Sequence, residues 1–438
     1  MEEITSQKLT EILNPAAKVK NCVINEIVTD SRKAAAGTLF VAIKGENFDG
    51  HNFVKTAIDN GCELAVVERF VDGVNQNCQI KVNNTVEAYG KLGAYNRSRF
   101  KGKVIGLTGS AGKTTTKEEI KCALSVFAKT YATQGNHNNH IGVPQSLLEM
   151  PMDAQFAVIE MGMSSKGEIA ALTRHVKPDI ALITNVYPMH IEFFENFEGI
   201  AEAKAEIFEG LPPNGTAIIN EDTNFAEVLE KRALEHNAKV VKFGSEHHYN
   251  GVLELKQDGE IQRYNAWAAL EVVKALGLDQ TKASSALKSF GALDGRGKKH
   301  LLPLNGGGTY TLIDDSYSGQ PEAMKIAVKA LDALPCQGRK IAVLGKMAEL
   351  GNTSKAEHIA IGELLAKSKI DIVIGVKEEM KDMLKMLPPR ITQYYFADKE
   401  GLAQFLQNKL LQNNDIVLIK GARYSSQLYK VTEVLLKG

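Results

Sequence analysis

The chain has 438 residues, the length of about three domains of ordinary size. Lys and Arg equal Asp and Glu in number, so the formal net charge is zero and nucleic acid held mainly by charge is not an expected partner. The chain lacks an apolar run of the roughly 20 residues that span a bilayer, and its first residues lack a signal-peptide pattern. With five scattered cysteines, it is predicted to be cytoplasmic, with reduced thiols and no membrane span.

Short apolar strands alternate with helical stretches, which predicts an α/β fold with parallel sheets in three blocks. Residues 1–99 contain strands in TLFVAIKG and CELAVVE and a helix through NNTVEAYGKLGAYNRSRF. Residues 100–295 begin with a strand in KVIG, continue with strands in FAVIEMG, DIALITNV, GTAIIN and AKVVKFG, and end with helices in NAWAALEVVKALG and TKASSALKSF. Residues 296–438 contain strands in TYTLIDD, RKIAVLG, IDIVIGV and NDIVLIKG.

A glycine-rich loop, GLTGSAGKTTTKE, lies between the first strand and the first helix of the second block. Gly109 and Gly112 allow the backbone to turn its N–H groups inward, Lys113 adds positive charge, and Thr114 offers a hydroxyl to Mg²⁺. The pattern is the compact Gly-x-x-Gly-Lys-Thr form, since Leu107 stands where the longer form has glycine. A glycine turn with an exposed lysine is the alternative, but the flanking elements favour phosphate binding. Guanine-reading Asn-Lys-x-Asp signals and protein-kinase motifs are absent from the sequence, which disfavours those two classes.

Two polar residues follow predicted strands of the same block. Glu160 ends the strand in FAVIEMG, where a carboxylate can hold Mg²⁺ opposite Thr114. A helix-capping or surface glutamate is the alternative. His190 follows the strand in DIALITNV, and a structural role is the more frequent one for a lone histidine.

Three further residues have weaker signals. Asp315 ends the strand in TYTLIDD and can bond a ribose or cap the next helix. Lys420 ends the last strand, at the same edge of the predicted sheet. Lys204 lies on an apparently amphipathic helix, where the residues alone indicate a solvated lysine.

Motifs along nearly the whole chain resemble the Mur ligase family. They are TDSRKAAAGTLFVAIKGENFDGHNF in the first block, TGSAGKTTTKE, TQGNHNNHIGVPQSLL, EMGMSSKGEIAAL and NVYPMHIEFFENFEGIAEAKAEIF in the second, and GRGKKH, LIDDSYSGQP, LGKMAELG and KGARYSS in the third. The resemblance implies a uridine-nucleotide substrate-binding domain at 1–99, a central ATP-binding P-loop domain at 100–295 and a C-terminal Rossmann-like domain at 296–438.

The resemblance also implies a reaction. GNHNNHIGVP and LGKMAELG favour the members that add D-alanyl-D-alanine to UDP-N-acetylmuramoyl-tripeptide, with ATP and Mg²⁺, through an acyl phosphate, in peptidoglycan precursor synthesis. The expected partners are these small molecules, and a monomer is expected. A member with a different amino acceptor and a non-catalytic nucleotide-binding homologue are the alternatives.

The same resemblance implies roles for individual residues. It implies that Lys204 is a carbamate, which reverses the solvated interpretation, and gives catalytic roles to Lys113, Lys204 and His190. Asn265 would meet adenine, Arg296 the γ-phosphate and Asp315 the ribose. The implied Mg²⁺ ligands are Thr114, Glu160, His190 and Lys204; the implied ATP-binding residues are Gly109, Ser110, Ala111, Gly112, Lys113, Thr114, Thr115, Asn265, Arg296 and Asp315; the implied substrate-binding residues are Ser31, Arg32, Lys44 and His51 for the uridine nucleotide, Asn138 and Asn139 for the sugar-peptide, and Lys420.

The chain departs from the family pattern outside the phosphate and metal residues. Ser318, Gly319 and Gln320 replace Asn-Ala-Asn before a proline. The other departures are Lys346 for aspartate, Ala422 for serine, Ile261 for histidine, and a stretch from Phe243 to Asn265 that is shorter than the family pattern.

Overall fold

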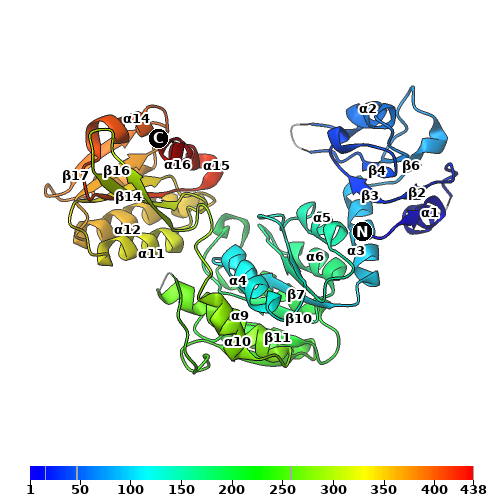
Figure 1. The fold of residues 1–438 in the computed structure, drawn as a ribbon, viewed down its shortest axis with the longest axis horizontal. Coiled ribbons are helices and arrows are strands. Elements are labelled where there is room, and N and C mark those ends of the chain that lie inside the picture. The colour runs from blue at the N-terminus through cyan, green and yellow to red at the C-terminus, as the bar shows by residue number, and fades with distance from the viewer. Residues whose placement is uncertain (15, 46–47, 257–258, 438) are drawn as a thin grey trace. The chain divides into compact units, whose positions relative to one another are not determined.

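The computed structural model of the protein describes residues 1–14, 16–45, 48–256 and 259–437. These residues form three parallel or mostly parallel sheets with helices packed on them, which confirms the predicted α/β class (Figure 1). The chain divides into two compact units, one of Met1–Val186 with Ala201–Lys288, the other of Tyr187–Ile200 with the residues from Ser289 onward. Each predicted block contains one of the three sheets, and the block boundaries stay a prediction.

The first sheet has four parallel strands in the order β3-β4-β5-β6. Helices α1 and α3 pack on one face of the sheet and α2 on the other, so strands β4 and β5 are buried throughout. Helix α3 begins after Asn84, whose side chain accepts the N–H of Glu87. The bounds are β3 Glu26–Val28, β4 Thr38–Val41, β5 Leu64–Val67, β6 Gln79–Lys81, α1 Ser6–Leu13, α2 Val54–Asp59 and α3 Thr85–Arg99, with a small antiparallel pair of β1 Ile4–Thr5 and β2 Val23–Ile24.

The second sheet has six parallel strands in the order β12-β11-β10-β7-β9-β8. Helices α4, α9 and α10 share one core with the sheet, while α5 and α6 contact it through β9 and β7. The strands are β7 Lys103–Thr108, β8 Thr130–Ala132, β9 Phe156–Glu160, β10 Ile180–Ile183, β11 Thr216–Asn220 and β12 Lys239–Phe243. The helices are α4 Lys113–Ser125, α5 Gly142–Glu149, α6 Glu168–Val176, α7 Glu198–Ala205, α8 Ala226–Glu235, α9 Glu260–Ala275 and α10 Gln280–Leu287.

Strand β7 is the point where the order of this sheet reverses. The chain passes from β7 through α4 to β8 on one side, returns to β9, and then crosses to β10 on the other side of β7. In open parallel sheets, ligands bind beyond the carboxyl ends of the strands at such a reversal. The glycine-rich loop follows β7 and therefore lies where this rule predicts a ligand.

The third sheet has the order β13-β14-β18-β15-β16-β17, parallel except for β13 at one edge. Separate apolar cores on its two faces contain α11 to α13 and α14 with α16. The strands are β13 Lys298–Pro303, β14 Thr309–Asp315, β15 Lys340–Gly345, β16 Ile372–Val376, β17 Thr392–Phe396 and β18 Ile416–Lys420. The helices are α11 Pro321–Ala333, α12 Ser354–Lys367, α13 Met380–Leu384, α14 Leu402–Phe405, α15 Arg423–Ser426 and α16 Tyr429–Lys437.

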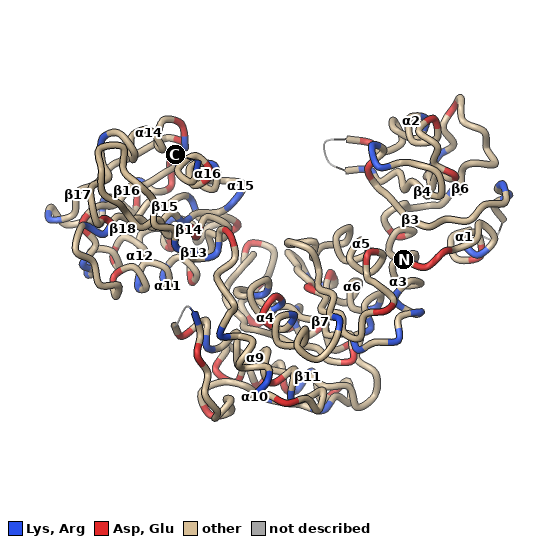
Figure 2. Tube along the Cα trace, in the orientation of Figure 1, with Lys and Arg blue, Asp and Glu red and all other residues tan. Residues whose placement is uncertain are grey.

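The sequence analysis missed the short or edge strands β1, β2, β3, β6, β8, β13 and β17. Their burial alternates or is incomplete, so they lack the continuous apolar run that marks the central strands. Basic and acidic residues are interspersed along the chain (Figure 2). Within the described parts, every helix is too short or too polar to cross a bilayer.

Candidate active site

The glycine-rich loop is built as the sequence predicts, between β7 and the start of α4. Gly112 has φ of 78° and is the residue from which α4 begins. A Cβ on Gly112 would lie 2.8 Å from Asn265 Oδ1, so the close approach of α9 requires glycine there. Lys113 Nζ donates to Gly109 O at 2.6 Å. The first turn of α4 turns its N–H groups and the positive end of its dipole to this edge of the sheet.

Thr184 and Asn185, which directly follow β10, hold the loop in place. Sequence reasoning missed both of them. Asn185 accepts the N–H of Ser110 with its backbone oxygen at 3.0 Å and that of Ala111 with its Oδ1 at 2.7 Å. Thr184 Oγ1 donates to Ala111 O at 2.8 Å. The amides of Ser110 and Ala111, which were predicted to bind phosphate, donate to Asn185 in this structure. The only sequence signal was the position of Thr184 and Asn185 at a strand end.

Asn265 lies on α9, beside the phosphate loop, and is buried. Its Oδ1 accepts the hydroxyl of Thr116 at 3.1 Å. This contact links α9 to α4 and places the amide at the loop, where the resemblance implies adenine. Its contact with adenine stays a prediction.

Glu160 ends β9 and is 1% exposed, so the surface alternative is wrong. Its Oε1 accepts Asn138 Nδ2 at 2.8 Å and Thr114 Oγ1 at 3.3 Å. Its other carboxylate oxygen, Oε2, is buried and has no hydrogen-bond partner among the described residues. A buried oxygen of this kind, next to a threonine hydroxyl, suits an oxygen-binding cation such as Mg²⁺.

Lys204, in α7, is 2% exposed, so the solvated interpretation from its local pattern is wrong. Burial, together with the charge of Lys113, lowers the pKa of the Lys204 ammonium well below its usual value. Burial thus favours the neutral, nucleophilic form of the amine, compared with an exposed lysine. Sequence reasoning without the resemblance missed it, because the segment has the pattern of a surface helix.

His190 belongs to the second compact unit. Its backbone has φ of 57°, and its Nδ1 lies 2.5 Å from Glu349 Oε2. The close approach of the His190 ring lowers the pKa of Glu349. The four implied metal ligands are therefore divided between the two units, with Thr114, Glu160 and Lys204 in the first.

Asp315 and Lys420 end the adjacent strands β14 and β18 and are direct partners in the sheet register. Lys420 Nζ donates to Asp315 Oδ2 at 2.7 Å. Burial raises the pKa of Asp315, and the Lys420 charge opposes this shift. The capping alternative for Asp315 is wrong, because α11 begins after Gln320, which makes no side-chain cap. Arg296 lies over the ring of Tyr317 at 4.3 Å.

The residues implied for the uridine nucleotide lie near the carboxyl edge of the first sheet. Arg32 is exposed and pairs with Asp30 at 2.6 Å, next to Ser31. Lys44 is exposed and forms a β-bridge with Asp49. His51 is buried: its Nδ1 lies 2.6 Å from Asp49 Oδ1, and its Nε2 accepts the N–H of Glu68 at 2.9 Å. Both ring nitrogens of His51 thus stabilise the scaffold, and its contact with a nucleotide stays a prediction.

Asn138 and Asn139 follow β8 in one loop. Asn138 orients Glu160 through the bond described above. Asn139 Oδ1 accepts the N–H groups of Ile141 and Gly142 at the start of α5. Both asparagines therefore have internal partners, and contact with a sugar-peptide stays a prediction.

Two departures from the family pattern meet in the second unit. A Cβ on Gly319 would overlap the backbone of Ala422, so the glycine at 319 allows the chain after β18 to pass close by. Lys346, after β15, forms an ion pair with Glu379. An aspartate at 346 would face Glu379 with the same charge.

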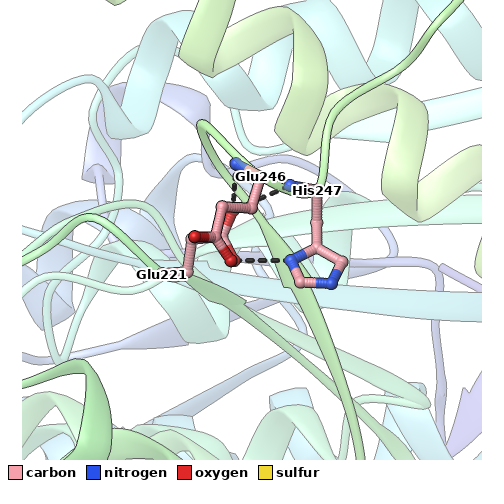
Figure 3. Close-up of side chains that lie close together, drawn as sticks. All are labelled: Glu221, Glu246 and His247. Atoms are coloured by element: carbon pink, nitrogen blue, oxygen red, sulfur yellow. Dashed lines mark hydrogen bonds and ion pairs between the residues drawn. The ribbon is translucent and has the colours of Figure 1, made fainter.

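A separate group of metal-ligand type, Glu221, Glu246 and His247, lies after β11 and β12 (Figure 3). Glu221 accepts the backbone N–H groups of Glu246 and His247 at 2.8 Å, and its other oxygen lies 2.6 Å from His247 Nδ1. Burial raises the pKa of Glu221, but the bonds from His247 and Glu246 outweigh it and lower the pKa. These bonds hold the turn after β12 against Glu221, so the group has a structural role.

A P-loop at the reversal of a parallel sheet, with a buried carboxylate and a buried lysine of lowered pKa beside it, defines a nucleotide-binding enzyme of the phosphoryl-transfer class. The chain matches the Mur ligase family, catalytic domain over residues 23–97, the Mur ligase middle domain over 107–281 and the Mur ligase, glutamate ligase domain over 303–423. It belongs to the Mur ligase family and is an ATP-dependent ligase.

Several relatives match over most or all of their length. The UDP-N-acetylmuramoyl-tripeptide–D-alanyl-D-alanine ligase of Escherichia coli is 34% identical over 99% of both chains, and that of Bacillus subtilis is 32% identical over 94% of this chain and 93% of its own. The crystal structure of MurF from Acinetobacter baumannii has a TM-score of 0.89 at 31% identity over 100% of both chains. MurF from Thermotoga maritima, solved with ADP, has a TM-score of 0.79 at 30% identity and covers 94% of this chain and 97% of its own.

Proposed function

We propose that the protein adds D-alanyl-D-alanine to UDP-N-acetylmuramoyl-tripeptide in peptidoglycan precursor synthesis, in the cytoplasm, where ATP is supplied. The terminal carboxylate of the tripeptide attacks the γ-phosphorus of ATP, giving an acyl phosphate and ADP. The amine of D-alanyl-D-alanine then attacks the acyl carbon, phosphate leaves, and the amine proton is released. The observation that carries the proposal is the buried Glu160–Lys204 region beside the P-loop, in a chain that matches ligases of this name over its full length.

Lys113 and the N-terminus of α4 bind the phosphates of ATP. Lys113 leaves the carbonyl of Gly109 and pairs with the transferring phosphoryl group, whose charge is spread over its oxygens during transfer. Asn265 is assigned to adenine, Asp315 to the ribose and Arg296 to the γ-phosphate. Ser31, Arg32, Lys44 and His51 are assigned to the uridine nucleotide, Asn138 and Asn139 to the sugar-peptide, and Lys420 to substrate.

Thr114, Glu160, His190 and a carbamate on Lys204 are assigned to Mg²⁺. The unpartnered Oε2 of Glu160 supports this assignment. Bound Mg²⁺ neutralises charge on the phosphate and acyl oxygens. A neutral Lys204 amine combines with CO₂ to give N–COO⁻ and a proton, and the lowered pKa of Lys204 supports this step.

The test is detection by mass spectrometry of UDP-muramoyl-pentapeptide formed from UDP-muramoyl-tripeptide, ATP and D-alanyl-D-alanine. Phosphate release should require both cosubstrates. Product formed from a free amino acid, but not from the dipeptide, would identify a ligase with another acceptor. Nucleotide binding without product under all of these conditions would identify a non-catalytic homologue. Light scattering tests the expected monomer in the same preparation.

A further inference from the structure

Lys117 is a buried lysine that the reaction described above does not use. It lies on α4, one turn after Lys113, and its relative exposure is 0%. Its Nζ donates to Thr133 O at 2.5 Å and to Gly135 O at 2.9 Å. Glu118 Oε1 lies 3.0 Å from the same Nζ. A compact ammonium with three N–H groups thus meets two backbone carbonyls and one carboxylate.

The carbonyls that Lys117 binds belong to the loop after β8. Further along this loop, Asn138 donates to Glu160 Oε1 at 2.8 Å, and its backbone oxygen accepts the N–H of Gly162. At the start of the loop, Thr133 Oγ1 accepts the N–H of Glu160 at 3.1 Å. The loop therefore holds Glu160 from both sides.

The close packing of Asn138 against Gly162 restricts the movement of the Asn138 side chain. A Cβ there would lie 2.9 Å from Asn138 Oδ1, so Asn138 fits tightly against the chain that follows β9. With Thr114 also bonded to Oε1, only Oε2 of Glu160 remains without a described partner. The orientation of the carboxylate thus depends on the position of the loop.

We propose that Lys117 is a positioning residue that holds the loop Thr133–Asn138 on α4 and so fixes the carboxylate of Glu160. The proposal rests on the proposed function, in which Glu160 binds Mg²⁺. An apolar side chain at 117 would leave two carbonyls without their donor, so the loop would move and Asn138 would no longer hold Oε1. Residues that orient metal ligands in this way affect metal affinity or activity by about 10–100-fold.

The experiment compares Lys117→Met with Lys121→Met in the full-length enzyme. Lys121 is on the same helix, but its side chain is 38% exposed and lies 3.9 Å from Glu118 Oε2. In Lys117→Met, the Mg²⁺ concentration for half-maximal ligation should rise about 10–100-fold, whereas the KM for D-alanyl-D-alanine should not change. Lys121→Met should match the wild type in both measurements. If Lys117→Met does not fold, Lys117→Gln, which keeps an amide donor, takes its place.

Hydrogen–deuterium exchange of residues 133–138 is measured on the same proteins without substrates. Exchange should be faster in Lys117→Met and unchanged in Lys121→Met. A folded variant with unchanged exchange, or with faster exchange and unchanged Mg²⁺ dependence, overturns the proposal. If Lys117→Met exchanges faster than the wild type but the wild type forms no pentapeptide, the proposed function is refuted while the role of the loop contact stands.

Discussion

The carboxyl edges of the two six-stranded sheets hold their charges in different ways. At the edge of the second sheet, Glu160 has a buried oxygen without a described partner, and Lys204 is buried with a pKa far below its usual value. At the edge of the third sheet, Asp315 and Lys420 form an ion pair at 2.7 Å. The neighbouring Asp314 accepts the N–H of Gly295 and the hydroxyl of Ser316.

The difference indicates where a ligand must supply the missing interactions. A buried charge or polar atom without a partner destabilises the fold, so it persists where something bound compensates for it. The second sheet keeps a carboxylate oxygen and a lysine of this kind beside the phosphate loop. At the edge of the third sheet the charged groups Asp315 and Lys420 pair with each other, and the buried atoms without a described partner there are the uncharged Gln320 Oε1 and Ser425 Oγ. Changes at the edge of the second sheet should therefore affect mainly activity. Changes at the edge of the third sheet should reduce stability in addition to any effect on the ligand binding assigned to Asp315 and Lys420.

The largest expected effect concerns the phosphate loop. Lys113→Ala should lower kcat about 10²–10³-fold, because it removes a charge that acts on the transferring phosphoryl group. Binding of the uridine substrate, assigned to the first sheet, should change little. Steady-state kinetics and calorimetry measure the two quantities, with Lys121→Ala as the control on the same helix. Equal losses in turnover and in uridine-substrate binding would contradict the role of Lys113.

Removal of CO₂ and bicarbonate should lower activity about 10–100-fold, with recovery when they return. The carbamate forms from the neutral amine, and burial favours that form by lowering the pKa of Lys204. ¹³C NMR with labelled CO₂ should show a carbamate signal that Lys204→Ala loses and Lys121→Ala retains. A fully active enzyme without this signal would disprove the carbamate.

At the edge of the third sheet, Lys420→Met should reduce the free energy of unfolding by about 2–3 kcal/mol, because it leaves Asp315 without its cation. The value is below that for complete burial, since the Asp315 side chain is 21% exposed. Asp315→Leu combined with Lys420→Met should recover most of the loss, as measured by urea unfolding. Lys385→Met, which breaks an exposed pair with Asp382, should change stability by less than about 0.5 kcal/mol. A double variant as unstable as the single one would show that the pair is not internally satisfied.

The smallest expected effect concerns Glu119, a buried carboxyl on α4 that has no assigned role. Glu119 is 3% exposed, and burial raises its pKa well above the usual value. The folded state therefore keeps its proton while the unfolded state loses it, so wild-type stability falls as pH rises above the ordinary glutamate pKa. Glu119→Gln should remove this pH-dependent loss of stability. Its free energy of unfolding should exceed that of the wild type by at least about 1 kcal/mol at pH 8, with little difference at pH 4.

Thermal unfolding across this pH range checks the prediction for Glu119. Glu227→Gln, at an exposed position, is the control and should show no such trend. A pH-independent difference between Glu119→Gln and the wild type would mean that Glu119 is ionised in the folded protein.

The parts of the site that sequence predicted are those set by local pattern. Gly112, Lys113 and Thr114 follow a strand and begin a helix, and Glu160 ends a continuous apolar run, so spacing alone located them. The central strands were found for the same reason, since both of their faces are buried.

The rest depends on contacts between distant segments. Lys204 has the local pattern of a surface helix, and its burial comes from packing that the pattern does not contain. Lys117 and Asn185 are polar residues whose partners lie 16 and 74 positions away along the chain. The edge strand β17, TQYYF, is mostly exposed or half-buried and resembles a loop in hydropathy.

The hydrogen bonds from Thr184 and Asn185 to the phosphate loop have a consequence for nucleotide affinity. They fix the backbone of Ser110 and Ala111 during folding, before any nucleotide is present. The conformational entropy of these residues is thus lost once, when the chain folds, and not again at each binding event. The cost of ordering on nucleotide binding then falls mainly on the side chain of Lys113, which must exchange the carbonyl of Gly109 for phosphate.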